Sequence, residues 1–236
     1  MRVVVPFAAE TPKTRLESVF SPDERSRFAS AMLADVLRAI AETGHKPTVV
    51  STAPLAVADL ELPEAVAAVT SVAVDERPLT DAVNAWLPGG DGAADESGAT
   101  GDPDHDPVAV VMADLALATP DALEGLLTTA ADVAIAPGRG GGTNALVVRH
   151  PAFRVDYHGT SYLDHCEIAR SVGADLETVD SFRLGTDIDE PADLVEVLVH
   201  GRTSDRALAR LREFGFALDD RDGRVGVARE TDRASE

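Results

Sequence analysis

Three aspartates in this sequence have the type and spacing of metal ligands. A single residue, Ile188, separates Asp187 from Asp189. On extended backbone this spacing puts both carboxylates on the same side of the chain. Asp114 is the one carboxylate within the apolar run from Val108 to Leu117. Carboxylate oxygens are the hard ligands that Mg²⁺ uses when it is shared with substrate phosphates. The pattern therefore predicts a magnesium site on Asp114, Asp187 and Asp189.

Each of these aspartates also has a structural interpretation. Asp is a common turn residue, so Asp114 could begin the turn before a helix that opens at Pro120. Asp189, two residues before Pro191, could be the N-cap of the next helix. Capping would account for one aspartate of the pair and leave Asp187 without a role, so the sequence favours the metal site.

Lys13 and Arg15 lie in the loop that follows the first expected strand. Lysine is rare in this chain, since Lys46 is the only other one. The loop should lie at the same edge of the sheet as Asp114, where open α/β sheets bind their ligands. A solvated basic pair is the alternative, but we interpret Lys13 and Arg15 as catalytic groups that contact phosphates.

A glycine-rich segment, Pro137–Asn144, supplies a second set of candidates. Its three consecutive glycines let the backbone approach a ligand and direct N–H groups at anionic oxygens, although a flexible turn is the alternative. It lacks the endings of a Walker loop and of a dinucleotide-binding turn. An arginine in it offers a fork-shaped donor for phosphate or carboxylate. The binding candidates here are Arg139, Gly140, Gly141, Gly142, Thr143 and Asn144.

The elements that would position these residues alternate between strand and helix. We expect strands over 2–7, 47–51, 66–74, 108–117, 132–136, 145–148, 176–179 and 182–185. We expect helices over 22–43, 79–87, 161–172 and 206–214, with others opening at 120 and 191, and a small hairpin over 216–227. Ser161 is the expected cap of its helix. Apolar runs without polar alternation are typical of strands buried on both faces. The pattern predicts an α/β fold with a mostly parallel central sheet and helices on both faces.

Composition limits the partners and the setting of the protein. The 236 residues carry a formal net charge of −20 and a pI of about 4.5, which disfavours binding to nucleic acid or to anionic membranes. Such an acidic, lysine-poor chain suggests adaptation to high salt, where charge repulsion is screened. The single cysteine, Cys166, excludes an intramolecular disulfide. Without an apolar stretch of spanning length or a signal peptide, we expect a cytoplasmic protein.

We predict a single domain over residues 1–236. Within it, residues 88–107 are glycine-rich and acidic, with no aliphatic side chain larger than alanine before the final proline, so we expect a disordered insertion there. His105 between two aspartates resembles a metal site on paper, but we interpret it as part of a solvated charge run. The tail from about residue 229 is expected to be flexible.

Together these residues resemble the 2-phospho-L-lactate guanylyltransferase family in its haloarchaeal form. The resemblance covers nearly the whole chain from Val3 to about Val199, outside the insertion. It is carried by Val5-Pro6, Lys13-Thr-Arg15-Leu16, Met112-Ala-Asp114-Leu115, Ala136–Leu146, Ser161 with His165, and Asp187-Ile-Asp189-Glu-Pro-Ala-Asp-Leu194. Where relatives often show Leu-Asn-x-Ala and Phe-Gly, this chain has Leu79-Thr80-Asp81-Ala82 and Tyr157-His158.

This resemblance implies a Rossmann-like nucleotidyltransferase domain that acts in biosynthesis of the deazaflavin coenzyme F-420. It implies GTP as donor, 2-phospho-L-lactate or phosphoenolpyruvate as acceptor, Mg²⁺ as cofactor and a homodimer. The three aspartates match metal ligands, and Thr143 and Ser161 match positions that hold the acceptor's carboxylate and phosphate. Gly159 is a further candidate for binding of substrate or nucleotide. Transfer to another phosphorylated acceptor, such as a molybdopterin or sugar phosphate, is one alternative. A nucleotide-binding module without catalysis is another, although it could dispense with the three aspartates.

Overall fold

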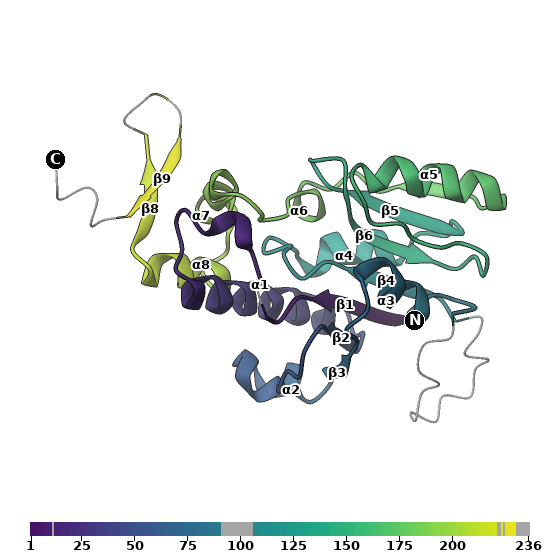
Figure 1. The fold of residues 1–236 in the computed structure, drawn as a ribbon, viewed down its shortest axis with the longest axis horizontal. Helices are drawn as coiled ribbons and strands as arrows, with labels where there is room; N and C mark the ends of the chain where they lie inside the picture. Colours follow the sequence, from purple (N-terminus) through teal and green to yellow (C-terminus); the bar gives the residue numbers. More distant parts are fainter. Residues whose placement is uncertain (11, 91–105, 221–222, 224, 230–236) are drawn as a thin grey trace.

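A seven-stranded mixed sheet runs through the middle of the computed structural model, which describes residues 1–10, 12–90, 106–220, 223 and 225–229 (Figure 1). Across the sheet the strands are β3 (Ser71–Val74), β2 (Pro47–Ser51), β1 (Arg2–Phe7), β4 (Val108–Val111), β6 (Thr143–Val148), β5 (Val133–Pro137) and β7 (Leu176–Thr178). Only β6 pairs antiparallel to its neighbours, β4 and β5. The predicted α/β fold with a mostly parallel sheet is confirmed.

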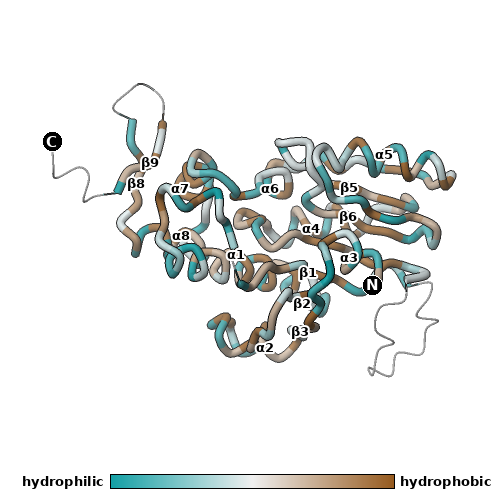
Figure 2. Tube along the Cα trace, in the orientation of Figure 1, coloured by the Kyte–Doolittle hydropathy of each residue, from teal (hydrophilic) through white to brown (hydrophobic). Residues whose placement is uncertain are grey.

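Helices cover both faces of this sheet. On one face, α1 (Pro22–Glu42) and α4 (Pro120–Leu127) pack on the side chains of Val3, Val5 and Val111. On the other, α3 (Leu79–Trp86) and α5 (Ser161–Val172) pack on strand residues that include Val4 and Val110. Each central strand is therefore apolar on both sides, which explains its unbroken apolar sequence. Figure 2 shows these strands as the hydrophobic middle of the molecule.

The start of α1 illustrates how local sequence fixes an element. Ser21 accepts a hydrogen bond from the Glu24 N–H at 3.3 Å, and Glu24 Oε2 accepts one from the Ser21 N–H at 2.8 Å. Pro22 occupies the first turn. This capping box satisfies two N–H groups that the helix leaves unpaired, as the sequence predicted.

Beyond the sheet, the C-terminal part forms a third apolar cluster against α1. It contains α7 (Leu194–His200), α8 (Arg206–Glu213) and the hairpin of β8 (Phe216–Asp219) and β9 (Gly226–Arg229), which projects at one end of the molecule in Figure 1. The hairpin was predicted. No helix among the described residues is both long and apolar enough to cross a membrane.

Three predicted strands are wrong in part or in whole. The strand expected over 108–117 ends at Val111, because the chain leaves the sheet there and turns at Asp114 and again before Ala118, whose N–H donates to the Leu115 carbonyl. The segment 66–74 contains the end of a short helix, α2 (Glu64–Ala67), before β3 begins, because Pro63 sets the N-cap backbone of a helical turn. The segment 182–185 is the helix α6 (Phe182–Gly185), because the Ser181 side chain caps the Leu184 N–H at 3.3 Å. The acidic insertion falls mainly on residues 91–105, outside the described residues, as does His105.

Candidate functional site

Lys13 lies between two of the predicted metal ligands. Its Nζ donates to Asp114 Oδ2 at 2.7 Å and to Asp189 Oδ1 at 2.6 Å, and Arg15 Nη1 donates to Asp189 Oδ2 at 3.2 Å. Burial alone would lower the pKa of Lys13, but Asp114 and Asp189 outweigh it, and the pKa is raised above its ordinary value. The two cations predicted to contact phosphates therefore contact the candidate metal carboxylates in this structure. We call Lys13, Asp114, Asp187 and Asp189 the central cluster.

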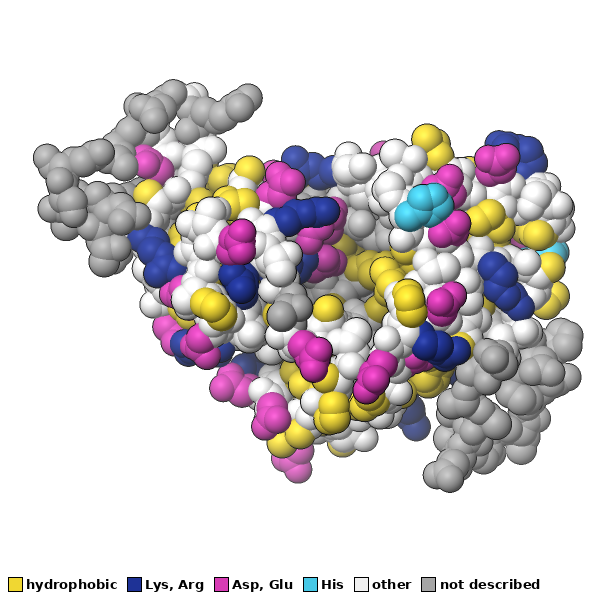
Figure 3. Space-filling model, in the orientation of Figure 1, with side chains coloured by type: hydrophobic (Ala, Val, Ile, Leu, Met, Phe, Trp, Pro, Cys, Tyr) yellow, Lys and Arg dark blue, Asp and Glu magenta, His cyan; other side chains and the backbone are white. Residues whose placement is uncertain are grey.

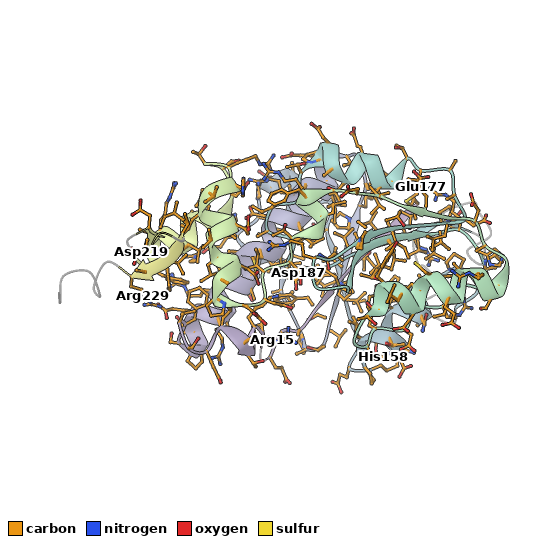
Figure 4. The ribbon with its side chains drawn as sticks, turned by 90° about the horizontal axis from the view of Figure 1, so that it is seen from above. Arg15, His158, Glu177, Asp187, Asp219 and Arg229 are labelled. Atoms are coloured by element: carbon orange, nitrogen blue, oxygen red, sulfur yellow. The ribbon has the colours of Figure 1, made fainter. Side chains whose placement is uncertain are left out.

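The backbone around Ile188 brings the aspartates together. Ile188 is fully buried in the C-terminal apolar cluster, and its N–H donates to the Asp114 carbonyl at 3.3 Å. Side chains alternate along extended backbone, so Asp187 and Asp189 both face away from that core. Figure 4 places Asp187 in the middle of the molecule, between the sheet and the C-terminal helices. The burial of Ile188 between two partly exposed aspartates fits the predicted i, i+2 arrangement.

Asp189 does not cap the helix that follows it. Glu190 is the N-cap of the turn Pro191–Asp193, and Asp193 Oδ2 accepts the N–H groups of Asp189 and Glu190 at 3.1 and 2.8 Å. The structural alternative for Asp189 is therefore wrong. Its carboxylate remains available to Lys13, Arg15 and a ligand.

Asp187 is held by a neighbour from the sheet. Asn144 Nδ2 donates to Asp187 Oδ1 at 3.1 Å and to the Leu184 carbonyl at 2.9 Å. Burial raises the pKa of Asp187, and the nearby charges of Asp114 and Asp189 add to the increase. Asn144, predicted as a ligand-binding residue, acts here as a support for this carboxylate.

The donor set of the central cluster fits a hard cation. Asp114 Oδ1 is buried and has no hydrogen-bond partner, so one carboxylate oxygen of the cluster is unsatisfied. Its other candidate donors are also carboxylate oxygens, as Mg²⁺ prefers. In the described parts of the chain, however, no three His, Cys, Asp or Glu side chains are arranged so that they could hold a metal ion, and the Lys13 amine contacts both Asp114 and Asp189.

The glycine-rich segment forms a tight turn between β5 and β6. The Gly138 N–H donates to the Gly142 carbonyl, and the Gly141 N–H donates to the Gly138 carbonyl, each at 2.9 Å. A Cβ at Gly138 would lie 2.5 Å from Asn144 Oδ1, and Gly141 has a φ of +85°, so glycine is required at both. The N–H groups of Gly140 and Gly142 have no hydrogen-bond acceptor among the described residues, which leaves them free for an anion.

Arg139 pairs with a carboxylate of the protein itself. Its Nη1 donates to Glu196 Oε1 of α7 at 3.2 Å, and its side chain is 58% exposed. The structure therefore places this predicted phosphate donor in a surface ion pair.

Thr143 and Ser161 come together from β6 and the start of α5, and both are almost fully buried. Thr143 Oγ1 lies 2.8 Å from His165 Nδ1. Ser161 was predicted to cap α5. That prediction is wrong, because Thr160 occupies the N-cap position. The Ser161 hydroxyl has no hydrogen-bond partner among the described residues, and Gly159, with a φ of +51°, lies in the exposed turn before it. The sequence indicates no chemical role for His165, which stands only, with Ser161, among the residues that carry the family resemblance.

A pocket of about 450 Å³ opens beside the central cluster (Figure 3). One end is lined by Lys13, Arg15, Asp114 and Asp189, and the other by side chains from the ends of β2 and β3 and from α3. The second end includes Val50, Thr52, Asp75, Arg77, Leu79 and Ala82. Thr143 and Ser161 do not line this pocket. A molecule with a flat ring that carries polar groups and with an anionic chain would match its two ends.

Comparison with known proteins supports one family. The family model described as "Guanylyl transferase CofC like" matches residues 1–230. The chain is 70% identical over 231 residues to the 2-phospho-L-lactate guanylyltransferase of Haloterrigena turkmenica, with 97% of each protein covered. It is 60% identical to the protein of that name from Natrialba magadii, covering 98% of this chain and 99% of the relative.

Solved structures agree on the fold alone. A protein from Desulfovibrio desulfuricans described as a nucleotide-diphospho-sugar transferase superposes with a TM-score of 0.65 at 19% identity, covering 89% of this chain and 93% of that one. A cytidylyltransferase from Leptospira borgpetersenii superposes with a TM-score of 0.50 at 12% identity, covering 90% and 92%. The sheet and its helices are therefore arranged as in proteins of the nucleotidyltransferase type.

Proposed function

Since the chain belongs to the CofC-like guanylyl transferase family, we propose that it transfers GMP from GTP to the phosphate of 2-phospho-L-lactate and releases pyrophosphate. Relatives at 50–70% identity that carry the name 2-phospho-L-lactate guanylyltransferase support this activity. The observation that carries it to a site is the pocket beside the central cluster, which joins a charged end to an end with both apolar and polar side chains. By the same resemblance, we place the reaction in coenzyme F-420 biosynthesis and expect a homodimer.

The nucleotide enters the pocket with its base at the end formed by Val50, Leu79 and Ala82. Its phosphates then reach Lys13 and Arg15, which lie at the opposite end. Flat apolar surface suits a purine ring, and cationic forks and amines suit phosphate oxygens. This orientation directs the α-phosphorus to the carboxylate side, where the reaction takes place.

The acceptor phosphate lies on the other side of the central cluster. The free N–H groups of Gly140 and Gly142 and the hydroxyls of Thr143 and Ser161 are hydrogen-bond donors suited to an acid with a phosphate and a carboxylate. The phosphate attacks the α-phosphorus in line, one P–O bond forms and the bond to pyrophosphate breaks. The nucleophile is already an anion at neutral pH, so the chain needs no general base.

Lys13 and Arg15 balance the charge that develops on the departing pyrophosphate. For this, the Lys13 amine leaves the carboxylates of Asp114 and Asp189 and turns to the phosphates. Asp114, Asp187 and Asp189 would hold Mg²⁺, which when bound neutralises phosphate oxygens and orients them for displacement. The buried, unpartnered Asp114 Oδ1 and the all-oxygen donor set support this cofactor.

The test combines each nucleoside triphosphate with 2-phospho-L-lactate or phosphoenolpyruvate, with and without Mg²⁺, and weighs the products by mass spectrometry. We expect a guanylylated acceptor and pyrophosphate only with GTP and Mg²⁺, and neither product after chelation. The Asp114→Asn variant is the control for contaminating activity. Transfer to neither acid, or equal use of all triphosphates, would contradict the proposal. Product from phosphoenolpyruvate alone would change the acceptor and keep the transfer.

A further inference from the structure

His165 is completely buried, and both nitrogens of its ring are engaged. Nε2 accepts a hydrogen bond from the Asp156 backbone N–H at 2.9 Å, and Nδ1 lies 2.8 Å from Thr143 Oγ1. The Asp156 N–H can only donate, so Nε2 carries no proton. The ring is therefore neutral, with its single proton on Nδ1, and this proton is donated to Thr143 Oγ1. The surrounding bonds fix one tautomer.

Packing holds the ring in this orientation. Phe153 and Tyr157 both meet it edge to face, with centroids 6.0 and 5.3 Å away. Burial lowers the pKa of His165 to about 4, so the neutral form persists at neutral pH. The residue combines a rigid aromatic environment with two directional hydrogen bonds, which is more than filling the core requires.

The bond to His165 determines what the Thr143 hydroxyl offers. A hydroxyl has one hydrogen to donate, and because Oγ1 already accepts from Nδ1, that hydrogen is directed elsewhere. Among the described residues, Thr143 Oγ1 has no other partner. The neighbouring Asn144 points to the opposite face of β6, where it holds Asp187. One strand thus supplies a hydroxyl donor on one face and a carboxylate support on the other.

We propose that His165 is a positioning residue for the acceptor: by donating to Thr143 Oγ1, it turns the hydroxyl hydrogen of Thr143 toward an acidic oxygen of the phosphorylated acid. This inference rests on the proposed function. The second bond of the ring, to Asp156, fixes the segment that leads through Gly159 to Ser161. His158, labelled in Figure 4, lies near α5 in this segment and pairs with the Asp156 carboxylate at 2.8 Å. His165 therefore contacts both segments that would form the acceptor site: Thr143 of β6, and the segment from Asp156 to Ser161.

The tautomer can be measured on the wild-type protein. Long-range ¹H–¹⁵N correlation spectra of protein labelled with ¹⁵N-histidine, at neutral pH in molar KCl, should show one histidine with a protonated Nδ1 and an unprotonated Nε2. The signal is assigned by its absence in His165→Asn. An Nε2-protonated ring or an imidazolium at His165 would overturn the proposal without any assay of activity.

Two isosteric variants test the positioning role. Leucine and asparagine have the same shape, but only asparagine retains a donor at the position of Nδ1. We expect His165→Leu to raise the KM for the acceptor about tenfold, equivalent to about 1.4 kcal/mol, and to leave the KM for GTP unchanged. His165→Asn should recover most of this loss. His165→Leu added to Thr143→Val should change the acceptor KM little further, because the hydroxyl that it positions is gone.

The outcomes separate this inference from the proposed function. A wild-type protein that forms no dinucleotide with either acid would refute the function, while the tautomer measurement would still decide the hydrogen bond. A wild-type protein that is active, with His165→Leu and His165→Asn equal in acceptor KM, would overturn the positioning role alone. Equal rises in both KM values, or additive effects in the double variant, would also overturn it, because they indicate a general structural role.

Discussion

Two clusters in this protein are each built from two or more aspartates and a cation, and only one has room for a ligand. In the first, which we call the helix-tie cluster, Asp35 and Arg38 of α1 meet Asp205 at the start of α8. Arg38 Nη2 donates to Asp205 Oδ1 at 2.7 Å, and the Asp35 oxygens accept the N–H groups of Arg206 and Ala207 at 2.9 Å each. Figure 1 shows α8 against α1, which this cluster joins.

The difference between the clusters lies in how their carboxylate oxygens are satisfied. In the helix-tie cluster, Asp35 and Asp205 are 2% and 3% exposed, and each of their oxygens accepts a hydrogen bond. In the central cluster, the Asp114 and Asp189 side chains are 24% and 35% exposed, and Asp114 Oδ1 has no partner. Saturated carboxylates stabilise a fold, whereas an unsatisfied oxygen beside a pocket is available to a ligand. Residue type alone does not separate the two.

The largest expected effect is on turnover by the central cluster. Each of Asp114→Asn, Asp187→Asn and Asp189→Asn keeps the side-chain shape and removes a charge that a metal requires. Loss of several kcal/mol of transition-state stabilisation lowers turnover by about a thousandfold. Melting temperatures without Mg²⁺ should hardly change for Asp114→Asn and Asp189→Asn. That of Asp187→Asn should rise, because the substitution removes a charge that burial and, to a smaller extent, Asp114 and Asp189 disfavour. Pyrophosphate release and melting curves measured side by side check both parts.

The same experiment has a result that would erase the distinction between the clusters. If one of these variants melts early and loses activity only in proportion to its unfolded fraction, that aspartate belongs with Asp35 and Asp205 as a structural residue. Three folded and inactive proteins would support the ligand site. The Lys13→Met variant is a reference for the melting temperatures. It should also fold, but it removes the amine that contacts the carboxylates of Asp114 and Asp189.

The sequence predicts the central cluster well because its signals are local. The i, i+2 spacing of Asp187 and Asp189 needs only extended backbone, and the position of Asp114 needs only the turn that follows a buried strand. The alternation of strands and helices follows from apolar periodicity in the same way. These features depend on neighbouring residues, so the fold class and the meeting of the aspartates follow without knowledge of distant contacts.

What the sequence does not predict depends on distant partners. The role of His165 requires Thr143 and Asp156 to meet it in space, and a lone histidine carries no mark of this. Asp35 caps α8 from 171 residues away, and no helix-capping pattern spans such a distance. The contact of Lys13 with two aspartates is also long-range. The sequence therefore indicates that cations lie at the site, but it does not indicate that they contact the aspartates.

The second largest effect is on stability, at the helix-tie cluster. Asp35→Ala leaves the buried N–H groups of Arg206 and Ala207 without acceptors and removes a partner of Arg38. We expect a loss of about 3 kcal/mol in the free energy of unfolding, because each buried donor left unpaired costs about 1–3 kcal/mol. The KM values and the turnover of the folded fraction should be unchanged. Denaturant titration beside the transfer assay measures this, and a variant that loses turnover while fully folded would contradict the separation of the two clusters.

The pH dependence of stability should report the same carboxyl group. Burial raises the pKa of Asp35 from 3.8 to about 6, so the folded protein holds this proton more tightly than the unfolded chain. The stability that it contributes is complete below pH 3.8 and is lost as the pH rises through about 6. Relative to Asp35→Asn, the wild-type free energy of unfolding should fall by about 2–3 kcal/mol between pH 4 and pH 7. A constant difference over that range would show that Asp35 titrates normally.

The smallest expected effect is that of salt on the stability that the helix-tie cluster contributes. We compare it with the effect of salt on the stability of the whole protein. With a net charge of −20, the chain repels itself, and we expect the wild type to melt earlier in about 0.1 M KCl, where the Debye length is about 10 Å, than in molar KCl, where it is about 3 Å. Buried pairs are screened far less than exposed ones, so the cost of Asp35→Ala in free energy of unfolding should differ by under about 0.5 kcal/mol between the two conditions.

Wild-type protein equally stable in both conditions would contradict the salt adaptation expected from composition. A cost of Asp35→Ala that shrinks strongly with salt would instead mean that water and ions reach Asp35 and Arg38, and the contrast with the central cluster would then rest on the unpartnered Asp114 Oδ1 alone.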